Sequence, residues 1–179
     1  TSSLVGSEMC IRDRAYIDSP QTIYIQNSSL VLKPVEKKNP DGTVSYISGR
    51  VNTQHKHDFL YGIFEARIKV PAGRGFLPAF WMMPVGNNYS TNPWPGCGEI
   101  DIMEEVGVDA NIVSSSIHCA AYNHTINTQK TASRNIGTAE SEFHVYACEW
   151  TPDYLKFFVD GTELMTFKNE GSGKNVWPF

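Results

Sequence analysis

Apolar and polar residues alternate along many short segments of this chain, and no segment keeps the 3.6-residue apolar spacing of an amphipathic helix. Alternation places successive side chains on opposite faces of a β-strand, so each such segment is predicted to be a strand. The predicted strands are residues 22–26, 30–34, 46–53, 59–70, 77–84, 113–121, 142–151, 154–159 and 162–168. Many short strands separated by turns indicate an all-β sandwich or barrel.

The predicted strands are connected by residues that favour tight turns. Asn27-Ser28-Ser29 separates the first two strands and predicts a hairpin, and Asp160-Gly161 predicts another near the end of the chain. Residues 37–43, Lys-Lys-Asn-Pro-Asp-Gly-Thr, are predicted to form a solvated loop.

One further strand is predicted at residues 98–107, where isoleucine and methionine separate four carboxylates. A solvated acidic run would not contain such large apolar side chains, so we expect a strand with a buried apolar face and an acidic face that lines a cleft. Glu99 and Asp101 share the acidic face. Regular alternation would add Glu105 to it, whereas a single-residue bulge would add Glu104 instead, and the spacing alone leaves both open.

Three carboxylates on one face repel one another, which would keep at least one of them protonated near neutral pH. This arrangement suits acid/base chemistry, and a pair of carboxyl groups that cleaves a glycosidic bond is the first candidate. Two alternatives remain open from the spacing: a divalent cation site, since carboxylates also bind calcium, and a solvated strand with coincidental acids.

The composition narrows the classes of function. The chain has 179 residues, enough for one domain with a core, and its hydrophobic content of 41% is ordinary for a globular protein. The net charge of −4 and the lack of a Lys/Arg cluster argue against a nucleic-acid partner. No apolar run approaches the roughly 18 residues that a membrane helix needs. Aromatic residues reach 12%, which suits β-structure and sugar-stacking surfaces.

Residues 1–14 lack the apolar region of a signal peptide and show neither periodicity nor continuity with the first predicted strand, so we interpret them as a disordered arm or a non-native leader. The cysteines have no metal-ligand spacing; Cys119 and Cys148 could form a disulfide, and free buried thiols are the alternative. Glycosylation sequons at Asn27, Asn88 and Asn123 permit secretion without requiring it.

Five segments, in sequential order, resemble glycoside hydrolase family 16, in particular its bacterial-type laminarinases (endo-β-1,3-glucanases). They are Ser48-Gly-Arg-Val51, Tyr61-Gly-Ile-Phe-Glu-Ala-Arg-Ile-Lys-Val-Pro71, Pro78-Ala-Phe-Trp-Met-Met-Pro84, Trp94-Pro-Gly-Cys-Gly-Glu-Ile-Asp-Ile-Met-Glu104 and Glu149-Trp-Thr-Pro152. The resemblance implies that residues 15–179 are part of a catalytic domain. It also implies a β-jelly roll of two curved antiparallel sheets, with the substrate cleft on the concave face.

The family motif has the form E-x-D-x-x-E, which implies a bulge near Met103. In that arrangement Glu99 is the nucleophile, Asp101 is its helper and Glu104 is the general acid/base. Glu105 would then point away from the cleft.

The resemblance also implies substrate contacts outside the acidic segment. Trp81 and Trp94 match family tryptophans that stack on glucose rings, and His118 matches a histidine near the acid/base. Glu65 and Arg67 match residues that bind sugar hydroxyls. Judged as residues alone, Trp81 could pack in the core, His118 could be a satisfied strand histidine, and the Glu65–Arg67 pair could be a surface ion pair worth roughly 0–1 kcal/mol.

The sequence departs from the family pattern in three places. Leu77 stands where the family often has tryptophan, so one stacking platform is expected to be absent. The family domain normally begins earlier, and it continues beyond Trp177-Pro178-Phe179. We therefore expect a fragment that lacks terminal strands.

The predicted function is retaining endo-hydrolysis of β-1,3-glucan such as laminarin, through a covalent glycosyl-enzyme. Two alternatives stay open: the same mechanism on mixed-linkage β-1,3/1,4-glucan or another family 16 polysaccharide, and a non-catalytic β-glucan-binding protein. We expect a secreted monomer that needs no cofactor for catalysis, and whose partner is a polysaccharide rather than nucleic acid or a membrane. The resemblance allows a structural calcium, but its ligands cannot be placed from the sequence.

Overall fold

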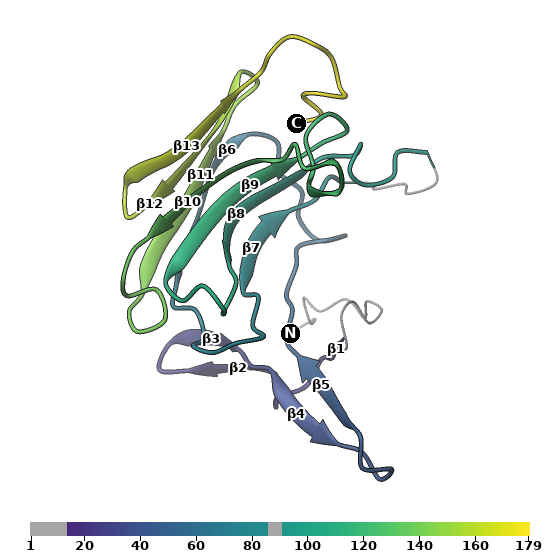
Figure 1. Cartoon of the computed structure of the whole chain (residues 1–179), viewed down its shortest axis with the longest axis vertical. Helices are drawn as coiled ribbons and strands as arrows, with labels where there is room; N and C mark the ends of the chain where they lie inside the picture. The colour runs from purple at the N-terminus through teal and green to yellow at the C-terminus, as the bar shows by residue number, and fades with distance from the viewer. Residues whose placement is uncertain (1–13, 86–90) are drawn as a thin grey trace. The chain divides into compact units, whose positions relative to one another are not determined.

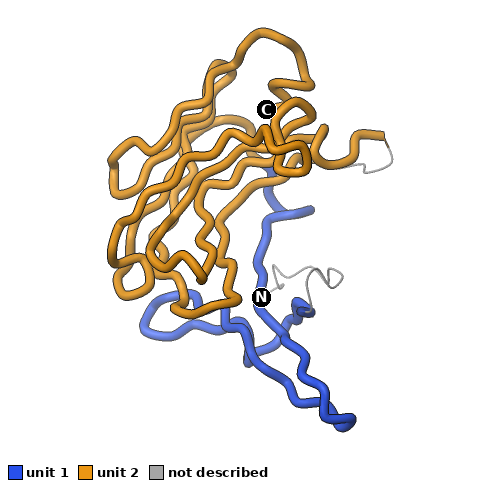
Figure 2. Tube along the Cα trace, viewed as in Figure 1, with its two compact units in different colours: residues 1–58 blue, residues 59–179 orange. Residues whose placement is uncertain are grey.

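The computed structural model describes residues 14–85 and 91–179, which belong to two compact units, residues 1–58 and 59–179 (Figure 2). The predicted leader, apart from Arg14, and the sequon at Asn88 lie outside the described residues. The described parts of both units are built of β-strands, with one short 3-10 helix (Figure 1). In these parts no helical segment has the length and apolar character of a membrane span.

The 1–58 unit contains the predicted hairpin, formed by β2 (Ile23–Gln26) and β3 (Ser29–Leu32). Its two-residue turn has positive φ at both positions, 49° at Asn27 and 59° at Ser28. This is the geometry that matches the twist of the flanking strands, and asparagine adopts it readily. The turn residues therefore set the register of this hairpin.

The same unit holds a three-stranded sheet in the order β1-β5-β4, made of β1 (Arg14–Tyr16), β4 (Val35–Lys38) and β5 (Val44–Ser48). β1 runs parallel to β5, and β4 runs antiparallel to it. The predicted loop 37–43 is therefore wrong at its start, because Lys37 and Lys38 belong to β4. An edge strand with exposed lysines is polar enough to resemble a loop in sequence, and such lysines also discourage edge-to-edge association.

The 59–179 unit consists of two four-stranded sheets (Figure 1). The site sheet has the order β10-β9-β8-β7 and contains β7 (Ala79–Met82), β8 (Glu99–Glu105), β9 (Ile112–His118) and β10 (Lys130–Asn135). The backing sheet has the order β13-β12-β11-β6 and contains β6 (Gly62–Ile68), β11 (His144–Trp150), β12 (Tyr154–Val159) and β13 (Thr162–Lys168). All neighbouring strands in both sheets are antiparallel.

The hydrophobic core lies between the two sheets. The site sheet contributes buried side chains from β8 and β9, and the backing sheet contributes them from β11, β12 and β13. They include Ile100, Ile102, Met103, Val113, Ile117, Tyr146, Cys148, Leu155, Phe157 and Phe167. Each fully buried large apolar side chain contributes roughly 1.5–3 kcal/mol. Because the apolar side of β8 is used in this core, the acidic side chains of β8 that are not buried on the core side lie on the opposite face.

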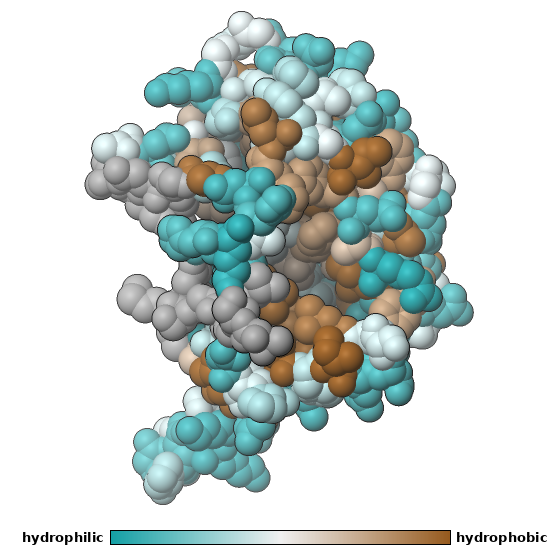
Figure 3. Space-filling view, turned by 180° about the vertical axis from the view of Figure 1, so that it is seen from behind, coloured by the Kyte–Doolittle hydropathy of each residue, from teal (hydrophilic) through white to brown (hydrophobic). Residues whose placement is uncertain are grey.

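The three described cysteines, Cys97, Cys119 and Cys148, are buried free thiols, so the disulfide considered for Cys119 and Cys148 is not formed. Some large apolar side chains are exposed, and Figure 3 shows hydrophobic surface, in brown, between hydrophilic residues, in teal. Two of the most exposed are Leu60, at 72%, and Ile63, at 71%, beside and on β6. β6 lies at the edge of the backing sheet in the described residues.

Candidate active site

β8 is the strand that carries the acidic residues, and its pairing with β9 shows which of them share a face. β9 continues without interruption, so Ser114, Ser116 and His118 lie on one face of the sheet. Their partners across the ladder are Glu104, Asp101 and Glu99, respectively. Directly opposite residues of antiparallel strands share a face, so all three acids lie on the same side as His118.

A β-bulge makes this possible. The register shifts between Asp101 and Glu104, and the two residues between them, Ile102 and Met103, both belong to the core and are 1% exposed. The expected bulge near Met103 is therefore present, and it changes the alternation so that Glu104 rather than Glu105 joins the acidic face.

Glu105 lies on the core side of the strand. It pairs with Val113, which is fully buried, and its own side chain is buried. Its Oε1 accepts a hydrogen bond from the backbone N–H of Asn111 at 2.7 Å, and burial raises its pKa. Of the two residues that the spacing allowed on the acidic face, Glu104 is therefore the one that lies there, and Glu105 does not.

Ser115 supports the bulge from the core side. Its buried Oγ donates to the carbonyl oxygen of Ile102 at 2.8 Å. A bulge disturbs the ladder, and a buried carbonyl without a partner costs free energy, so this hydroxyl satisfies a group that the bulge displaces. Sequence reasoning did not identify Ser115, since a serine among three consecutive serines gives no local signal.

Glu99 lies in a half-buried position against Trp94. The indole Nε1–H of Trp94 donates to Glu99 Oε2 at 2.6 Å. The pKa of Glu99 is raised to about 7, mainly by burial and next by the neighbouring charge of Asp101, while the hydrogen bond from Trp94 opposes the rise. Trp94 thus favours the ionised form of this carboxyl group.

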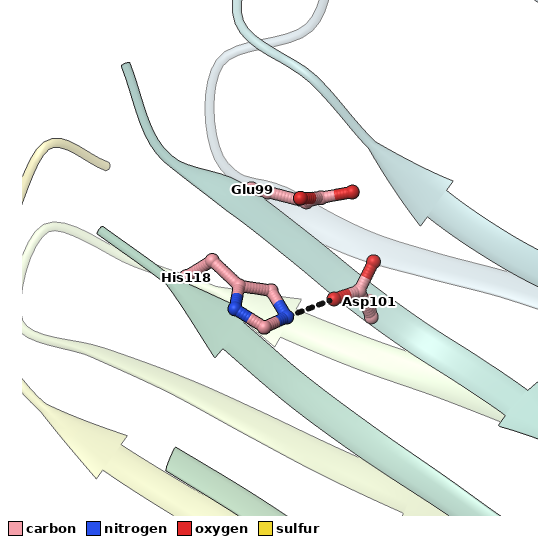
Figure 4. Close-up of side chains that lie close together, drawn as sticks. All are labelled: Glu99, Asp101 and His118. Atoms are coloured by element: carbon pink, nitrogen blue, oxygen red, sulfur yellow. Dashed lines mark ion pairs between the residues drawn. The ribbon is translucent and has the colours of Figure 1, made fainter. Parts of the chain in front are cut away.

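Asp101 is buried beside His118, whose Nε2 lies 3.2 Å from Asp101 Oδ2 (Figure 4). The pKa of Asp101 is raised to about 8, mainly by burial and next by the charge of Glu104. A carboxylate oxygen of Asp101 lies within 4.8 Å of one of Glu99, so each of these carboxyl groups makes ionisation of the other more costly. This agrees with the expectation that crowding keeps one acid protonated near neutral pH.

His118 is the basic partner in this cluster. Burial lowers its pKa, and the negative charges of Glu99 and Glu104 work in the other direction. A neutral imidazole with its proton on Nε2 can donate to Asp101 and hold that carboxyl group in place. The structure therefore brings His118 to the acids, as predicted.

Trp81 lies on the acidic face as well. It pairs with Asp101 across the β7–β8 ladder, whereas its neighbours Phe80 and Met82 pack against the core. The alternative of core packing for Trp81 is therefore wrong, and its position beside Asp101 is one from which a ring can contact a bound sugar.

Glu65 and Arg67 are not brought to this site, and the predicted sugar contact needs correction. On β6 they pair with Ala147 and Val145 of β11. Alternation places these residues on the side of β11 opposite the buried Tyr146, so Glu65 and Arg67 point outward from the backing sheet. The Arg67 guanidinium lies 4.5 Å from the ring centre of Phe143. Alternation correctly predicted that Glu65 and Arg67 share a polar face of their strand. It could not predict that this face lies on the outer side of the backing sheet.

His124 is a residue of the site that sequence reasoning missed. It begins the 3-10 helix η1 (His124–Ile126) in the connection between β9 and β10. The centre of its ring lies 4.9 Å from that of Trp94 and 5.2 Å from that of His118. A contact between two loops cannot be predicted from the local sequence of either loop.

A metal ion is the alternative occupant that the acidic spacing left open. Among the described residues, one group has suitable donors: Glu99, Asp101 and His118, whose ligand atoms lie within 4.8 Å of one another. Calcium prefers six to eight oxygen ligands, and this group offers two carboxylates and a nitrogen. The N–H of Trp94 also donates a hydrogen bond to Glu99, and this donor would compete with a cation for the same carboxylate oxygen. The donor set does not fit the structural calcium that the resemblance allows.

Known proteins are similar to this chain in sequence and in the arrangement of their strands. The sequence model of the family "Glycosyl hydrolases family 16" matches residues 13–179. The chain is 46% identical over 139 residues to the "Beta-glucanase" of Rhodothermus marinus, which covers 75% of this chain and 49% of the relative. It is 33% identical over 163 residues to the "Glucan endo-1,3-beta-glucosidase A1" of Niallia circulans, which covers 87% of this chain and 24% of the relative.

Solved structures agree with the sequence relatives. The X-ray structure of the laminarinase from Rhodothermus marinus superposes with a TM-score of 0.84 at 36% identity, covering 93% of this chain and 68% of that chain. The laminarinase from Flavobacterium sp. UMI-01 gives a TM-score of 0.79 at 39% identity, with the same coverage. These matches confirm the predicted jelly-roll sandwich. The chain spans between a quarter and a half of the length of the two sequence relatives, and about two thirds of these solved chains.

Proposed function

Because this chain belongs to family 16 of the glycosyl hydrolases, we propose that it supplies the catalytic centre of a retaining endo-β-1,3-glucanase. The observation that carries the proposal is the bulge in β8. It places Glu99, Asp101 and Glu104 on one face, opposite Ser114, Ser116 and His118 of a regular strand. A strand without the bulge would direct Glu104 into the core.

In the proposed first step, the ionised carboxylate of Glu99 attacks the anomeric carbon and forms a glycosyl ester, while the glycosidic bond to the leaving oxygen breaks. Glu104 gives its proton to that oxygen. In the second step, water attacks the anomeric carbon of the glycosyl ester, Glu104 takes a proton from the water, and the Glu99 carboxylate leaves. This double displacement retains the anomeric configuration and needs two carboxyl groups roughly 5–5.5 Å apart.

Asp101 is proposed as the helper of Glu99. Carboxylate oxygens of the two groups lie within 4.8 Å of each other, and His118 Nε2 lies 3.2 Å from Asp101 Oδ2. Near neutral pH Asp101 keeps its proton, because its pKa is raised to about 8, and Glu99 can then carry the single negative charge of the pair. When Glu99 forms the ester, Asp101 stays neutral, so the pair leaves no buried charge beside the ester.

The substrate is proposed to be a β-1,3-linked glucan such as laminarin. Trp81 lies beside Asp101, and Trp94 contacts Glu99 through its indole, so both rings lie where they can pack on sugar rings close to the cleaved bond. The names of the relatives support a β-glucan. We also propose that the protein acts outside the cell, because a polysaccharide of this size does not enter it.

The test is the release of reducing sugar from laminarin by the full-length protein and by the Glu99→Ala variant. We expect a loss of at least about 10³-fold, because removal of a nucleophile abolishes the covalent route. Glu142→Ala is the matched control, since Glu142 is exposed and distant in sequence from β8. Proton NMR of the first product formed should show the β-anomer.

Each other outcome has a distinct meaning. Full activity in the Glu99→Ala variant would overturn the assignment of the nucleophile. Tight binding of laminarin by the intact protein without release of reducing sugar would favour a β-glucan-binding protein. Faster hydrolysis of lichenan than of laminarin would keep the mechanism and change the linkage preference to mixed β-1,3/1,4-glucan.

A further inference from the structure

Trp94 has to be held in place by its neighbours, because it lies between β7 and β8, outside any strand. Its indole nevertheless makes a short hydrogen bond, 2.6 Å, to Glu99. A hydrogen bond to an ionised carboxylate depends strongly on distance and direction. The side chains that fix this ring therefore affect the state of Glu99.

Two imidazoles pack on the indole. The rings of His124 and Trp94 have centres 4.9 Å apart and planes inclined by 37°, and those of His118 and Trp94 have centres 5.8 Å apart. The two imidazoles also meet each other edge to face, at 5.2 Å and 82°. These separations lie within the range of favourable aromatic contacts. The rings of Trp94, His118 and His124 thus form a closed group, which we call the ring cluster.

The loop that carries His124 is fixed by Asn123, which is 2% exposed. Its Nδ2 donates to the carbonyl oxygens of Cys119 and Ala120, at 3.1 and 3.3 Å. Its Oδ1 accepts from the backbone N–H and the hydroxyl of Thr125, at 3.1 and 2.6 Å. All the polar atoms of this side chain are in use, so Asn123 constrains the backbone on both sides of His124. The sequon at Asn123 is thereby also closed to glycosylation in the folded chain.

We infer that His124 is a positioning residue for Glu99, which acts by packing on the Trp94 indole and so maintaining the hydrogen bond from Trp94 Nε1 to Glu99 Oε2. The inference rests on the proposed function, in which Glu99 attacks as a carboxylate. It differs from the role of His118, which meets Asp101 directly. The packing needs a planar ring at position 124 and does not need an ionisable one.

A pH readout can separate this role from a purely structural one. The groups that face Glu99 are Asp101 and Glu104 on its own strand, His118 from β9, Cys97 from the preceding turn, and the indole of Trp94. His124 contacts two of these groups, the Trp94 indole and the His118 ring, and both favour the ionised carboxylate; the indole is the one that is hydrogen-bonded to it. Loss of the bond should therefore raise the pKa of Glu99 and move the acid limb of the activity profile to higher pH.

The experiment compares His124→Ala, His124→Phe and the control Ile126→Ala, which alters an exposed residue of the same 3-10 helix. For His124→Ala we expect kcat on laminarin to fall about tenfold with little change in KM, and the acid limb to move up by about 0.5–1 pH unit. His124→Phe should keep at least half of the wild-type kcat, and its acid limb should lie at the same pH as that of the wild type. Ile126→Ala should match the wild type.

A second measurement does not depend on activity. The indole Nε1–H signal of Trp94 is assigned by its loss in Trp94→Phe, and its exchange with solvent is followed by NMR. We expect exchange about tenfold faster in His124→Ala than in the wild type and in His124→Phe. If the wild type does not hydrolyse laminarin, the proposed function fails, and the exchange rates still test the ring cluster.

Two outcomes overturn the inference. One is a His124→Ala variant with the kcat, the acid limb and the indole exchange of the wild type. The other is an equal loss of activity in His124→Phe and His124→Ala, which would mean that the imidazole itself meets the substrate.

Discussion

The 59–179 unit contains two histidine–aspartate pairs, and the pKa of the aspartate is shifted in opposite directions in the two. In the site sheet, His118 Nε2 lies 3.2 Å from Asp101 Oδ2, and the pKa of Asp101 is raised to about 8. Beside the backing sheet, His144 Nδ1 lies 2.6 Å from Asp160 Oδ2, and the pKa of Asp160 is lowered. The side chain of Asp101 is 5% exposed and that of Asp160 is 50% exposed.

The surroundings of each carboxyl group explain the difference. Asp160 accepts hydrogen bonds from His144 and from the backbone N–H of Val145, and both favour its ionised form. Asp101 has lost most of its contact with water and lies next to the charge of Glu104. Desolvation and like charge both favour the protonated form. The histidine is present in both pairs, so it does not decide the outcome.

The comparison shows what distinguishes a site for chemistry from a structural pair in this protein. A paired aspartate near the surface stabilises a turn and keeps its ordinary charge. A buried aspartate among other acids retains a proton near neutral pH, and groups of this kind occur mainly where acid/base chemistry takes place. The crowding of carboxylates, rather than the presence of a histidine, is therefore the signal for function.

The largest effect should come from Asp101→Asn, and Asp160→Asn is the matched variant of the other pair. For Asp101→Asn we expect kcat/KM on laminarin to fall about 10²-fold, because the helper of Glu99 is lost. The acid limb of the pH profile should also move to lower pH, because asparagine cannot take up the negative charge whose repulsion raises the pKa of Glu99 as the two carboxyl groups titrate together. Asp160→Asn should retain activity within about twofold. Both are read from pH–rate profiles of laminarin hydrolysis.

The contrast between the pairs would be broken by two results. Equal losses of activity in Asp101→Asn and Asp160→Asn would mean that both act only through folding, which a thermal unfolding curve would show. An acid limb that moves to higher pH in Asp101→Asn would mean that Asp101 assists the ionisation of Glu99 instead of opposing it.

The acidic strand shows how far the sequence could be interpreted without a structure. Isoleucines between acids predicted a strand with one buried face, and β8 has it. Alternation could not choose between Glu104 and Glu105, because the choice depends on a bulge that buries both Ile102 and Met103. The register is a property of the pairing with β9, so it is absent from the strand's own sequence.

The same limit applies elsewhere in the chain. β13 was predicted at its observed bounds, since both of its ends adjoin turn residues. β10 was not predicted, because Lys-Thr-Ala-Ser-Arg-Asn has little apolar character to alternate. For Glu65 and Arg67, periodicity gave the side of the strand but not the surface of the sandwich. The contact of His124 with Trp94 joins two loops, and only the folded chain brings them together.

A smaller effect should result from removing the support of the bulge, on which the crowding at Asp101 depends. In Ser115→Ala the carbonyl of Ile102 loses its hydroxyl partner, so Glu104 is held less firmly on the acidic face. We expect kcat on laminarin to fall about fivefold with KM unchanged, since roughly 1 kcal/mol corresponds to one such hydrogen bond. Ser115→Thr, which keeps a hydroxyl, should recover most of this loss.

Ser133→Ala is the control for this prediction, because Ser133 is an exposed serine of β10. Wild-type kcat in Ser115→Ala would show that the bulge is maintained by packing of Ile102 and Met103 alone. An equal fall in all serine variants would indicate a general loss of folded protein, which the amplitude of the unfolding transition measures.

The two pairs should also differ in how they link stability to pH. The folded chain keeps a proton on Asp101 at pH values where the unfolded chain, with an ordinary pKa near 3.9, has released it. Asp101 therefore makes the free energy of unfolding fall as the pH rises from about 4 to 8. In Asp101→Asn this part of the fall is removed, so the variant should gain stability relative to the wild type between pH 5 and pH 8. Urea unfolding at these two values measures the gain, and a constant difference between the two proteins would contradict it.

The smallest effect is expected for Asp160→Asn, with the opposite dependence on pH. The pKa of Asp160 is lower in the folded chain, so its contribution is fully present above the unfolded pKa and is lost as the pH falls through the folded value. Because this carboxyl group is half exposed, we expect a loss of at most about 1 kcal/mol at pH 7 and almost none at pH 2. Urea unfolding at both values checks this. A loss that persists at pH 2 would assign the effect to the turn between β12 and β13, and the two pairs would then differ in more than the protonation of their aspartates.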